Sequence, residues 1–162
     1  MLRTMAGIGG IRKSLTQSST AADLQFAMDT LGARVGLTPM LLPFTTSIIL
    51  MTVAPASRPA SPRNVFFGHV LSALVGLFVV SLSREPLWPA TFAVGIAVAA
   101  MQITRTLHPP AGITAFIMVA THQGWQFVLL PVAAGAFILV AYSFLFRQMT
   151  GGWTRGRSVW RG

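Results

Sequence analysis

From Val65 to Leu82 the chain reads VFFGHVLSALVGLFVVSL, a run of 18 residues with no charged side chain. An α-helix of about 20 apolar residues crosses the ~30 Å hydrocarbon core of a bilayer, so this run predicts a transmembrane helix. Gly68, Ser72 and Gly76 share one face of that helix, where small side chains allow another helix to approach closely. The run therefore indicates a membrane-embedded helical fold, and its small-residue face is a candidate contact between copies of the chain.

Three further spans of comparable length are predicted around this run, at residues 36–54, 87–106 and 125–146. The first of them holds Pro39 and Pro43, which leave backbone carbonyls without helical partners. That arrangement is tolerated where a helix faces protein or a cavity. The span at residues 87–106 carries a second stripe of small residues, formed by Thr91, Gly95 and Ala99. We therefore expect an all-α polytopic membrane bundle with about four transmembrane helices.

Between the last two predicted spans lie His108-Pro109-Pro110-Ala111-Gly112 and an apolar stretch from Ile113 to Thr121. At 1.5 Å per residue this stretch reaches only about 20 Å, which is too short to cross the bilayer core. Proline is favoured at the first position of a helix. The segment therefore predicts a short re-entrant half-helix that starts at the His-Pro-Pro motif, dips into the membrane and stops near His122.

The composition fits a membrane protein and excludes several functions. Of the 162 residues 53% are hydrophobic and 9% charged, and the mean hydropathy is +0.66. The net charge of +9 would suggest nucleic-acid binding in a soluble chain, but the apolar fraction argues against it. With no cysteine and three Asp or Glu residues in all, the chain offers neither thiolates nor a catalytic carboxylate pair. We expect no enzyme activity, no cofactor and no nucleic-acid partner.

The basic residues predict an orientation in the membrane. If the half-helix is re-entrant, nine of them share one side: Arg3, Arg12, Lys13, Arg34, Arg84, Arg147, Arg155, Arg157 and Arg161. The remaining three, Arg58, Arg63 and Arg105, then lie opposite. If the segment spans instead, the split becomes five to seven, without a clear bias. The positive-inside rule favours the first arrangement, with both termini cytoplasmic, in a bacterial inner membrane.

The two ends of the chain differ from the single membrane domain at residues 36–146. Residues 1–35 are polar, and we expect residues 1–19 to be disordered. From Thr20 onward an apolar stripe at Leu24, Met28, Leu31 and Val35 predicts a short amphipathic helix at the membrane surface. Residues 147–162 combine arginines with tryptophans, which is typical of a cytoplasmic tail anchored on an anionic leaflet.

Two stretches resemble the HPP family of integral membrane proteins: SPRNVFFGH at residues 61–69 and TRTLHPPAG at residues 104–112. The resemblance covers about residues 40 to 147 and implies a small multispan protein. Some members are described as nitrite transporters, so it implies a small-anion permease. The chain departs from the family by a polar segment where many members carry a further helix, and by Pro43-Phe44-Thr45-Thr46-Ser47 in place of a small-residue run. That run keeps Phe44 and Ser47 but loses its glycine, and Thr45 and Thr46 would narrow a permeation path there or change its polarity.

The His-Pro-Pro motif carries the candidate chemistry. A half-helix that begins at the motif directs its free N–H groups and the positive end of its dipole toward the preceding loop, which suits an anion. We expect the amides of Ala111, Gly112 and Ile113 to be the donors, because proline has none. The predicted anion site consists of Thr104, Arg105, His108, Pro109, Pro110, Ala111, Gly112 and Ile113, completed by Arg63, Asn64 and His69. The partners are then a small inorganic anion, the lipid bilayer and, because four spans bury little surface, further copies of the chain.

Structural roles compete with this prediction. Arg105 can reach the membrane interface from a span end, the prolines can merely start a helix, and Arg63 and Asn64 can cap one. His69 can bond a backbone carbonyl inside its helix. A metal or haem site is a further interpretation of the three histidines, His69, His108 and His122, but the lack of a nearby carboxylate disfavours it. The alternative function is a non-transporting scaffold or sensor subunit that packs beside a partner membrane protein.

Overall fold

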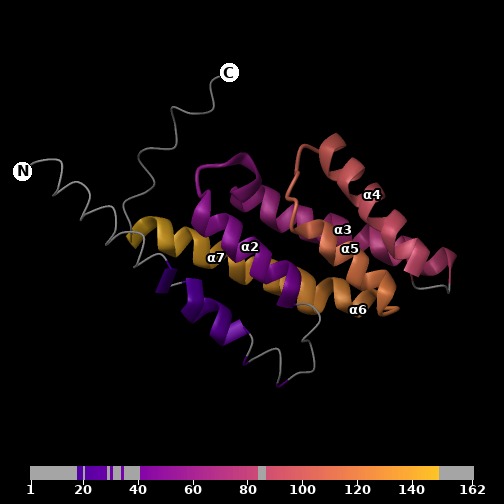
Figure 1. The fold of residues 1–162 in the computed structure, drawn as a ribbon, viewed down its shortest axis with the longest axis horizontal. Coiled ribbons are helices and arrows are strands. Elements are labelled where there is room, and N and C mark those ends of the chain that lie inside the picture. Colours follow the sequence, from indigo (N-terminus) through magenta and orange to yellow (C-terminus); the bar gives the residue numbers. More distant parts are fainter. Residues whose placement is uncertain are drawn as a thin grey trace, which may run out of the picture.

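The computed structural model describes residues 18–19, 21–28, 30, 34, 41–83 and 87–149. All regular elements in these residues are helices (Figure 1), so the predicted all-α fold is confirmed. In chain order they are α2 (Leu41–Val53), η2 (Arg58–Ala60), α3 (Pro62–Leu82), α4 (Leu87–Ile103), α5 (Ala111–Ala120), α6 (Trp125–Phe127), η3 (Val128–Ala133) and α7 (Ala134–Met149). The expectations for residues 1–17 and 150–162 lie outside the described residues, while residues 21–28 are helical as predicted.

Two stretches are long and apolar enough to cross a membrane by length and composition: Pro62–Leu82 and Trp125–Leu145. Helix α3 begins at Pro62 because Ser61 caps it, its hydroxyl accepting the N–H of Asn64. The second stretch combines α6, η3 and α7. Leu130 leaves the helical conformation just before Pro131, which cannot donate a helical hydrogen bond. This helix is therefore kinked, as its proline allows.

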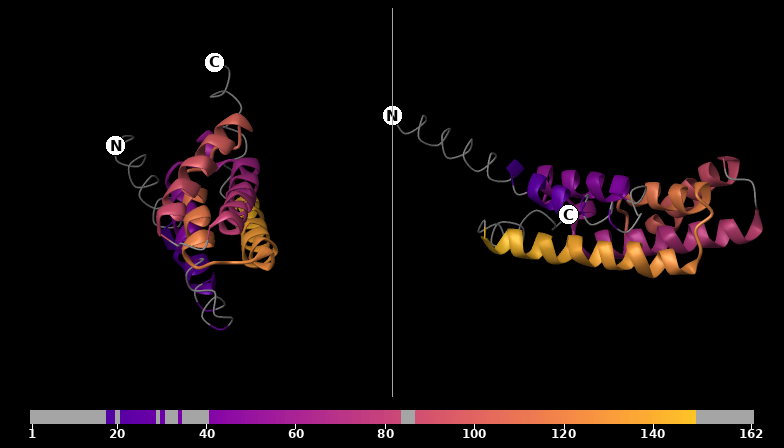
Figure 2. Two further views of the ribbon diagram at one scale, coloured as in Figure 1. Left: turned by 90° about the vertical axis from the view of Figure 1, so that its right-hand side faces the viewer. Right: turned by 90° about the horizontal axis from the view of Figure 1, so that it is seen from below.

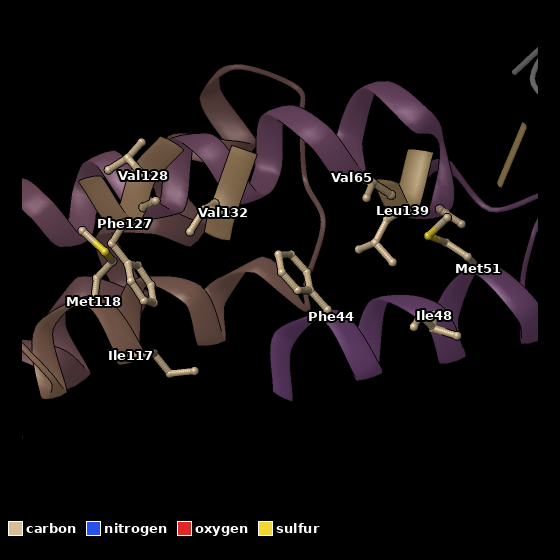
Figure 3. Packing of buried hydrophobic residues seen from close by; sticks show 12 residues of the cluster. Phe44, Ile48, Met51, Val65, Ile117, Met118, Phe127, Val128, Val132 and Leu139 are labelled. Atoms are coloured by element: carbon tan, nitrogen blue, oxygen red, sulfur yellow. The ribbon is translucent and has the colours of Figure 1, made fainter. Parts of the chain in front are cut away.

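The long helices run antiparallel between two ends of the bundle. We call these the Pro59 end, which holds the turn at residues 54–61, and the Ser83 end, which holds Ser83 and the turn at residues 121–124. Helix α3 runs from the Pro59 end to the Ser83 end and α4 returns beside it. Helix α7 also finishes at the Pro59 end, because Val128 lies beside Met118 whereas Leu139 lies beside Val65 (Figure 3).

Helices α2 and α5 are short and lie end to end along the bundle (Figures 1 and 2). Both begin in its middle, and they run in opposite directions along α3 and α7. With 13 residues α2 measures about 20 Å, and with 10 residues α5 measures about 15 Å. The 21-residue α3 measures about 32 Å, so the two short helices together match one long one.

The core lies between this pair of short helices and the two long ones (Figure 3). Gly76 of α3 touches α5 so closely that a Cβ atom there would come within 2.5 Å of the Met118 Cβ. The Phe44 ring of α2 likewise fills the space that a side chain at Gly135 of α7 would need. The packing is therefore closest where each short helix crosses a glycine of a long one.

Helix α2 covers Leu41–Val53 of the span predicted over residues 36–54, and residues 36–40 lie outside the described part of the chain. Two expectations need correction. The short helix predicted after the His-Pro-Pro motif is present as α5, but it runs parallel to α3 and delivers the chain to the Ser83 end, so α7 can return it to the Pro59 end. The C-terminal end of α7 and the turn at residues 54–61 thus share one end, not opposite ones. The face of Gly68, Ser72 and Gly76 is buried within this chain, against the His108 loop and α5, and is not a free contact for another copy.

In the helix at residues 21–28, Leu24 and Met28, two members of the predicted apolar stripe, pack against the core of the bundle. The position of this helix at the membrane surface stays a prediction.

Candidate functional site

A chain of buried polar side chains occupies the point where α2 and α5 meet. At its centre is Ser47, on the second turn of α2. Its Oγ lies 2.9 Å from Nε2 of His69 and 2.9 Å from Nε2 of His108. The same oxygen lies 2.7 Å from the carbonyl oxygen of Pro43, one turn earlier. All three side chains that meet here are 0% exposed, so one hydroxyl joins two histidines out of contact with water.

His69 comes from the second turn of α3 and is held from two further directions. Its Nδ1 lies 2.8 Å from the hydroxyl of Thr114, on the first turn of α5. The Phe44 ring meets it edge-on with a centroid distance of 5.1 Å. The expected bond from His69 to a backbone carbonyl is wrong, because both of its nitrogens face hydroxyl groups. Phe44 and Ser47, the two residues kept from the family run, are the ones that contact this histidine.

His108 is positioned by the loop at residues 104–110. Its Nδ1 donates to the carbonyl oxygen of Pro59 at 2.7 Å, and the side-chain amide of Asn64 donates to the carbonyl of Leu107 at 3.1 Å. The loop can lie this close to α3 because Gly68 has no side chain: a Cβ there would come within 2.8 Å of the His108 Cβ. The two imidazole rings end with their centroids 5.1 Å apart.

We call Thr114, His69, Ser47 and His108 the buried polar chain. It runs without interruption from the first turn of α5, through α3 and α2, to the turn that contains Pro59. The N-terminal ends of α2 and α5 both point toward it. Each helix N-terminus carries about half a positive charge, so the two dipoles add at this position.

The expected backbone donors of the half-helix are not free. The N–H groups of Ala111, Gly112 and Ile113 donate to the carbonyls of His108, Pro109 and Pro110, respectively. These bonds close tight turns in which each amide serves the start of α5 itself. The amides predicted as anion donors are therefore occupied by the backbone, and the buried side chains of this region bond mainly one another.

The predicted arginines lie outside the buried polar chain. Arg63 and Arg105 are exposed. Arg63 is the second residue of α3, and Arg105 follows the end of α4 by two residues. Arg105 adopts a left-handed backbone conformation with φ of 56°, and the neighbouring Thr104 bonds Thr106 and the carbonyl of Ala100. Among the described residues the two buried histidines bond Ser47, Thr114 and Pro59, so neither arginine takes part. The two arginines therefore lie at the surface of the bundle, apart from the buried histidines.

Two members of the buried polar chain were missed by sequence reasoning. Ser47 and Thr114 belong to no predicted site, although Ser47 stands in the family run. The sequence shows hydroxyl residues in two apolar stretches, but it does not show that these residues lie at the same level of the folded bundle. His122, by contrast, is exposed at the far end of α5. In the part of the chain that the structure describes, no three His, Cys, Asp or Glu residues cluster as metal ligands would.

Comparisons with known proteins identify a family of membrane proteins. The model of the HPP transmembrane region matches residues 10–156. Two transmembrane proteins of Dictyostelium discoideum are 33% and 35% identical to this chain over 105 residues, which is 60% of its length. The matched part is 34% of one relative and 37% of the other, so the chain spans about a third of their length. No solved structure matches the chain.

Proposed function

Since the chain belongs to the HPP transmembrane family, we propose that it carries a small monovalent anion across the membrane, through the junction of α2 and α5. One observation carries the proposal: two short helices begin head to head inside the bundle, with buried polar side chains between them. In transporters, broken helices direct their N-terminal ends at anionic substrates, because the dipole and the unpaired donors favour negative charge.

The chemistry of the buried polar chain supports an anion rather than a cation. Its donors are imidazole N–H and hydroxyl groups, and the described acidic residue, Asp23, is exposed on residues 21–28. A cation would meet two positive helix ends and no carboxylate. A planar anion such as nitrate or nitrite matches donors that converge from several directions. Because every residue of the buried polar chain is 0% exposed, we take this structure as the closed form of the pathway, which opens when α2 and α5 separate.

The proposed membrane arrangement follows from the helix lengths. We place α3, α4 and the kinked helix of α6, η3 and α7 across the bilayer, and α2 with α5 as a fourth, broken span. The half-helix α5 then leads from the middle of the bilayer to the Ser83 end. Arg58, Arg63 and Arg105 are exposed at or near the Pro59 end, where α7 also finishes, and the positive-inside rule puts this end in the cytoplasm. A bacterial plasma membrane is the proposed location.

We also propose a homo-oligomer, through a face different from the one predicted. Thr91, Gly95 and Ala99 form the second small-residue stripe, and all three are exposed on α4. A Cβ at Gly95 would meet nothing within 4 Å. Small residues on a lipid-facing helix allow a second helix to approach closely, which supports α4 as the contact between subunits.

Flux into proteoliposomes tests the proposal. Nitrate, nitrite, formate and chloride are compared side by side, and protein-dependent flux of at least one of them is expected. His108→Asn should reduce the flux at least tenfold, because it removes Nε2 from the junction while its amide can still bond Pro59. His122→Asn, at an exposed histidine, is the matched control. If protein that inserts and purifies normally gives no flux of any anion, the transporter proposal is wrong and the scaffold alternative takes its place.

A further inference from the structure

The hydrogen bonds of Ser47 cannot all form while both buried histidines are neutral. A hydroxyl group has one proton to donate and two lone pairs to accept with. The carbonyl of Pro43 can only accept, so its contact with Ser47 is a hydrogen bond only when Ser47 donates its proton there. Both imidazoles must then donate to Ser47 through Nε2–H. All three contacts of Ser47 are thus hydrogen bonds at once only when each of the two nitrogens that face this oxygen carries a proton.

His108 already carries a proton on its other nitrogen. Nδ1 faces the carbonyl of Pro59 at 2.7 Å, and a carbonyl cannot donate. While Ser47 donates to Pro43, His108 therefore bonds both of its partners only in the doubly protonated, cationic form. In its neutral form it bonds both only when Ser47 donates to its Nε2 instead. His69 has no such requirement, because the hydroxyl of Thr114 can donate to its Nδ1. All five contacts of the buried polar chain become hydrogen bonds when one extra proton resides on His108.

We propose that His108 is the site where the protein takes up one proton together with its anion. The proposal rests on the proposed function and adds the co-substrate to it. When the proton leaves, Nε2 of His108 becomes an acceptor, and the Ser47 hydroxyl turns from the Pro43 carbonyl to this nitrogen. The carbonyl of Pro43 also accepts a hydrogen bond from the backbone of α2, so it keeps a partner when the Ser47 hydroxyl rotates away. Ser47 is thus a positioning residue with two defined states.

The surroundings of His108 couple the proton to an anion. Ser47 faces it from α2, Gly68 and His69 from α3, and the Pro59 carbonyl from the turn; of these only His69 can titrate. The positive ends of α2 and α5 oppose a cation on His108. An anion bound between them removes that opposition, so each species raises the affinity for the other, as linkage requires. One anion and one proton then move together without net charge.

The experiment uses the full chain in proteoliposomes and nitrate as the probe, because nitric acid is too strong to cross membranes as a neutral molecule. Potassium and valinomycin set the membrane potential, and the pH gradient is varied independently. One-to-one symport predicts about tenfold nitrate accumulation per unit of pH gradient, since one pH unit corresponds to a tenfold equilibrium ratio. It also predicts that changing the potential at a fixed pH gradient leaves that accumulation unchanged.

Variants separate His108 from the rest of the pathway. In His108→Asn the pH-driven accumulation should disappear, and any residual nitrate flux should follow the potential. His122→Asn should accumulate nitrate as the unaltered chain does. Nitrate flux in the unaltered chain that follows the potential and ignores the pH gradient overturns the proton proposal while leaving anion transport intact. Nitrate accumulation driven by the pH gradient that persists in His108→Asn also overturns the proton proposal. Absence of flux for every anion overturns both the proton proposal and the anion-transport proposal.

Discussion

Adding one methyl group at Gly76 tests the contact between α3 and α5. A Cβ at this position would lie 2.5 Å from the Cβ of Met118 and 3.1 Å from the carbonyl oxygen of Ala115. Neither atom can move away by a side-chain rotation, so the helices must separate by about 1 Å to reach normal van der Waals distance. Gly76→Ala therefore opens the packing between α3 and the second half of α5, about two helical turns beyond His69.

The size of the effect follows from two opposing contributions. Replacing glycine by alanine inside a helix stabilises it by about 1 kcal/mol. Overpacking a tight contact destabilises by about 1–3 kcal/mol, so Gly76→Ala should lower the free energy of unfolding by up to about 2 kcal/mol. Gly95→Ala is the matched control, because a Cβ there meets nothing within 4 Å and only the helical gain of about 1 kcal/mol remains.

Thermal unfolding of the purified protein in one detergent, followed by tryptophan fluorescence, measures the difference. At about 2–4 °C per kcal/mol for a chain of this size, Gly76→Ala should melt several degrees below Gly95→Ala. Nitrate flux should also fall in Gly76→Ala alone. If the two variants melt together, or if Gly76→Ala melts higher, α5 does not lie against Gly76 and the head-to-head arrangement of α2 and α5 is wrong.

Three further perturbations address other parts of the structure. Ser47→Ala leaves two buried imidazole nitrogens without a partner and should lower the free energy of unfolding by about 2–4 kcal/mol. Ser72→Ala is its control, because among the described residues the buried Ser72 hydroxyl bonds the Met101 sulfur at 3.8 Å, and it should cost less than about 1 kcal/mol. Equal melting temperatures of the two variants would contradict the hydrogen-bond chain. Gly135→Ala should force the Phe44 ring out of its place and lower the melting temperature, which the same fluorescence assay detects; an unchanged value would show that the ring packs elsewhere. Because the chain has no cysteine, single cysteines can be introduced at the exposed Ala56 and Gly124. The two cysteines should react with an impermeant maleimide from opposite sides of the membrane. If both are labelled from the same side, the antiparallel course of α3 and α7 is wrong.

The sequence predicts the helices of this protein better than it predicts their neighbours. Apolar length locates α3, and the prolines and short apolar run after His108 locate α5. What the sequence does not reveal is which faces turn inward. Helix α3 is apolar all round, so the periodicity that identifies the buried face of a soluble helix is weak here. His69 was recognised because a titratable group inside a span needs a partner, whereas Ser47 and Thr114 look like ordinary hydroxyl residues until three helices bring them together.

The direction of the chain through α5 depends on packing rather than on composition. The distribution of basic residues favours a re-entrant segment, whereas Met118 against Gly76 and Thr114 against His69 fix α5 parallel to α3. Charge bias acts through basic residues near the ends of spans. Close helix packing and a buried hydrogen-bond chain act over the whole segment, so the contacts inside the bundle define the course of α5 more directly than the count of arginines does.

The His-Pro-Pro motif solves a problem created by starting a helix inside a membrane. The first four N–H groups of a helix lack helical partners, and an unpaired one in hydrocarbon costs several kcal/mol. Pro109 and Pro110 have no N–H to strand, and the carbonyl of His108 accepts the N–H of Ala111. The backbone of the motif is thus occupied in beginning α5, while the His108 ring remains to bond Pro59 and face Ser47. Proline substitutions would disturb both roles together, so the side chain of His108 is where the structural role of the motif and the proposed transport can be separated by experiment.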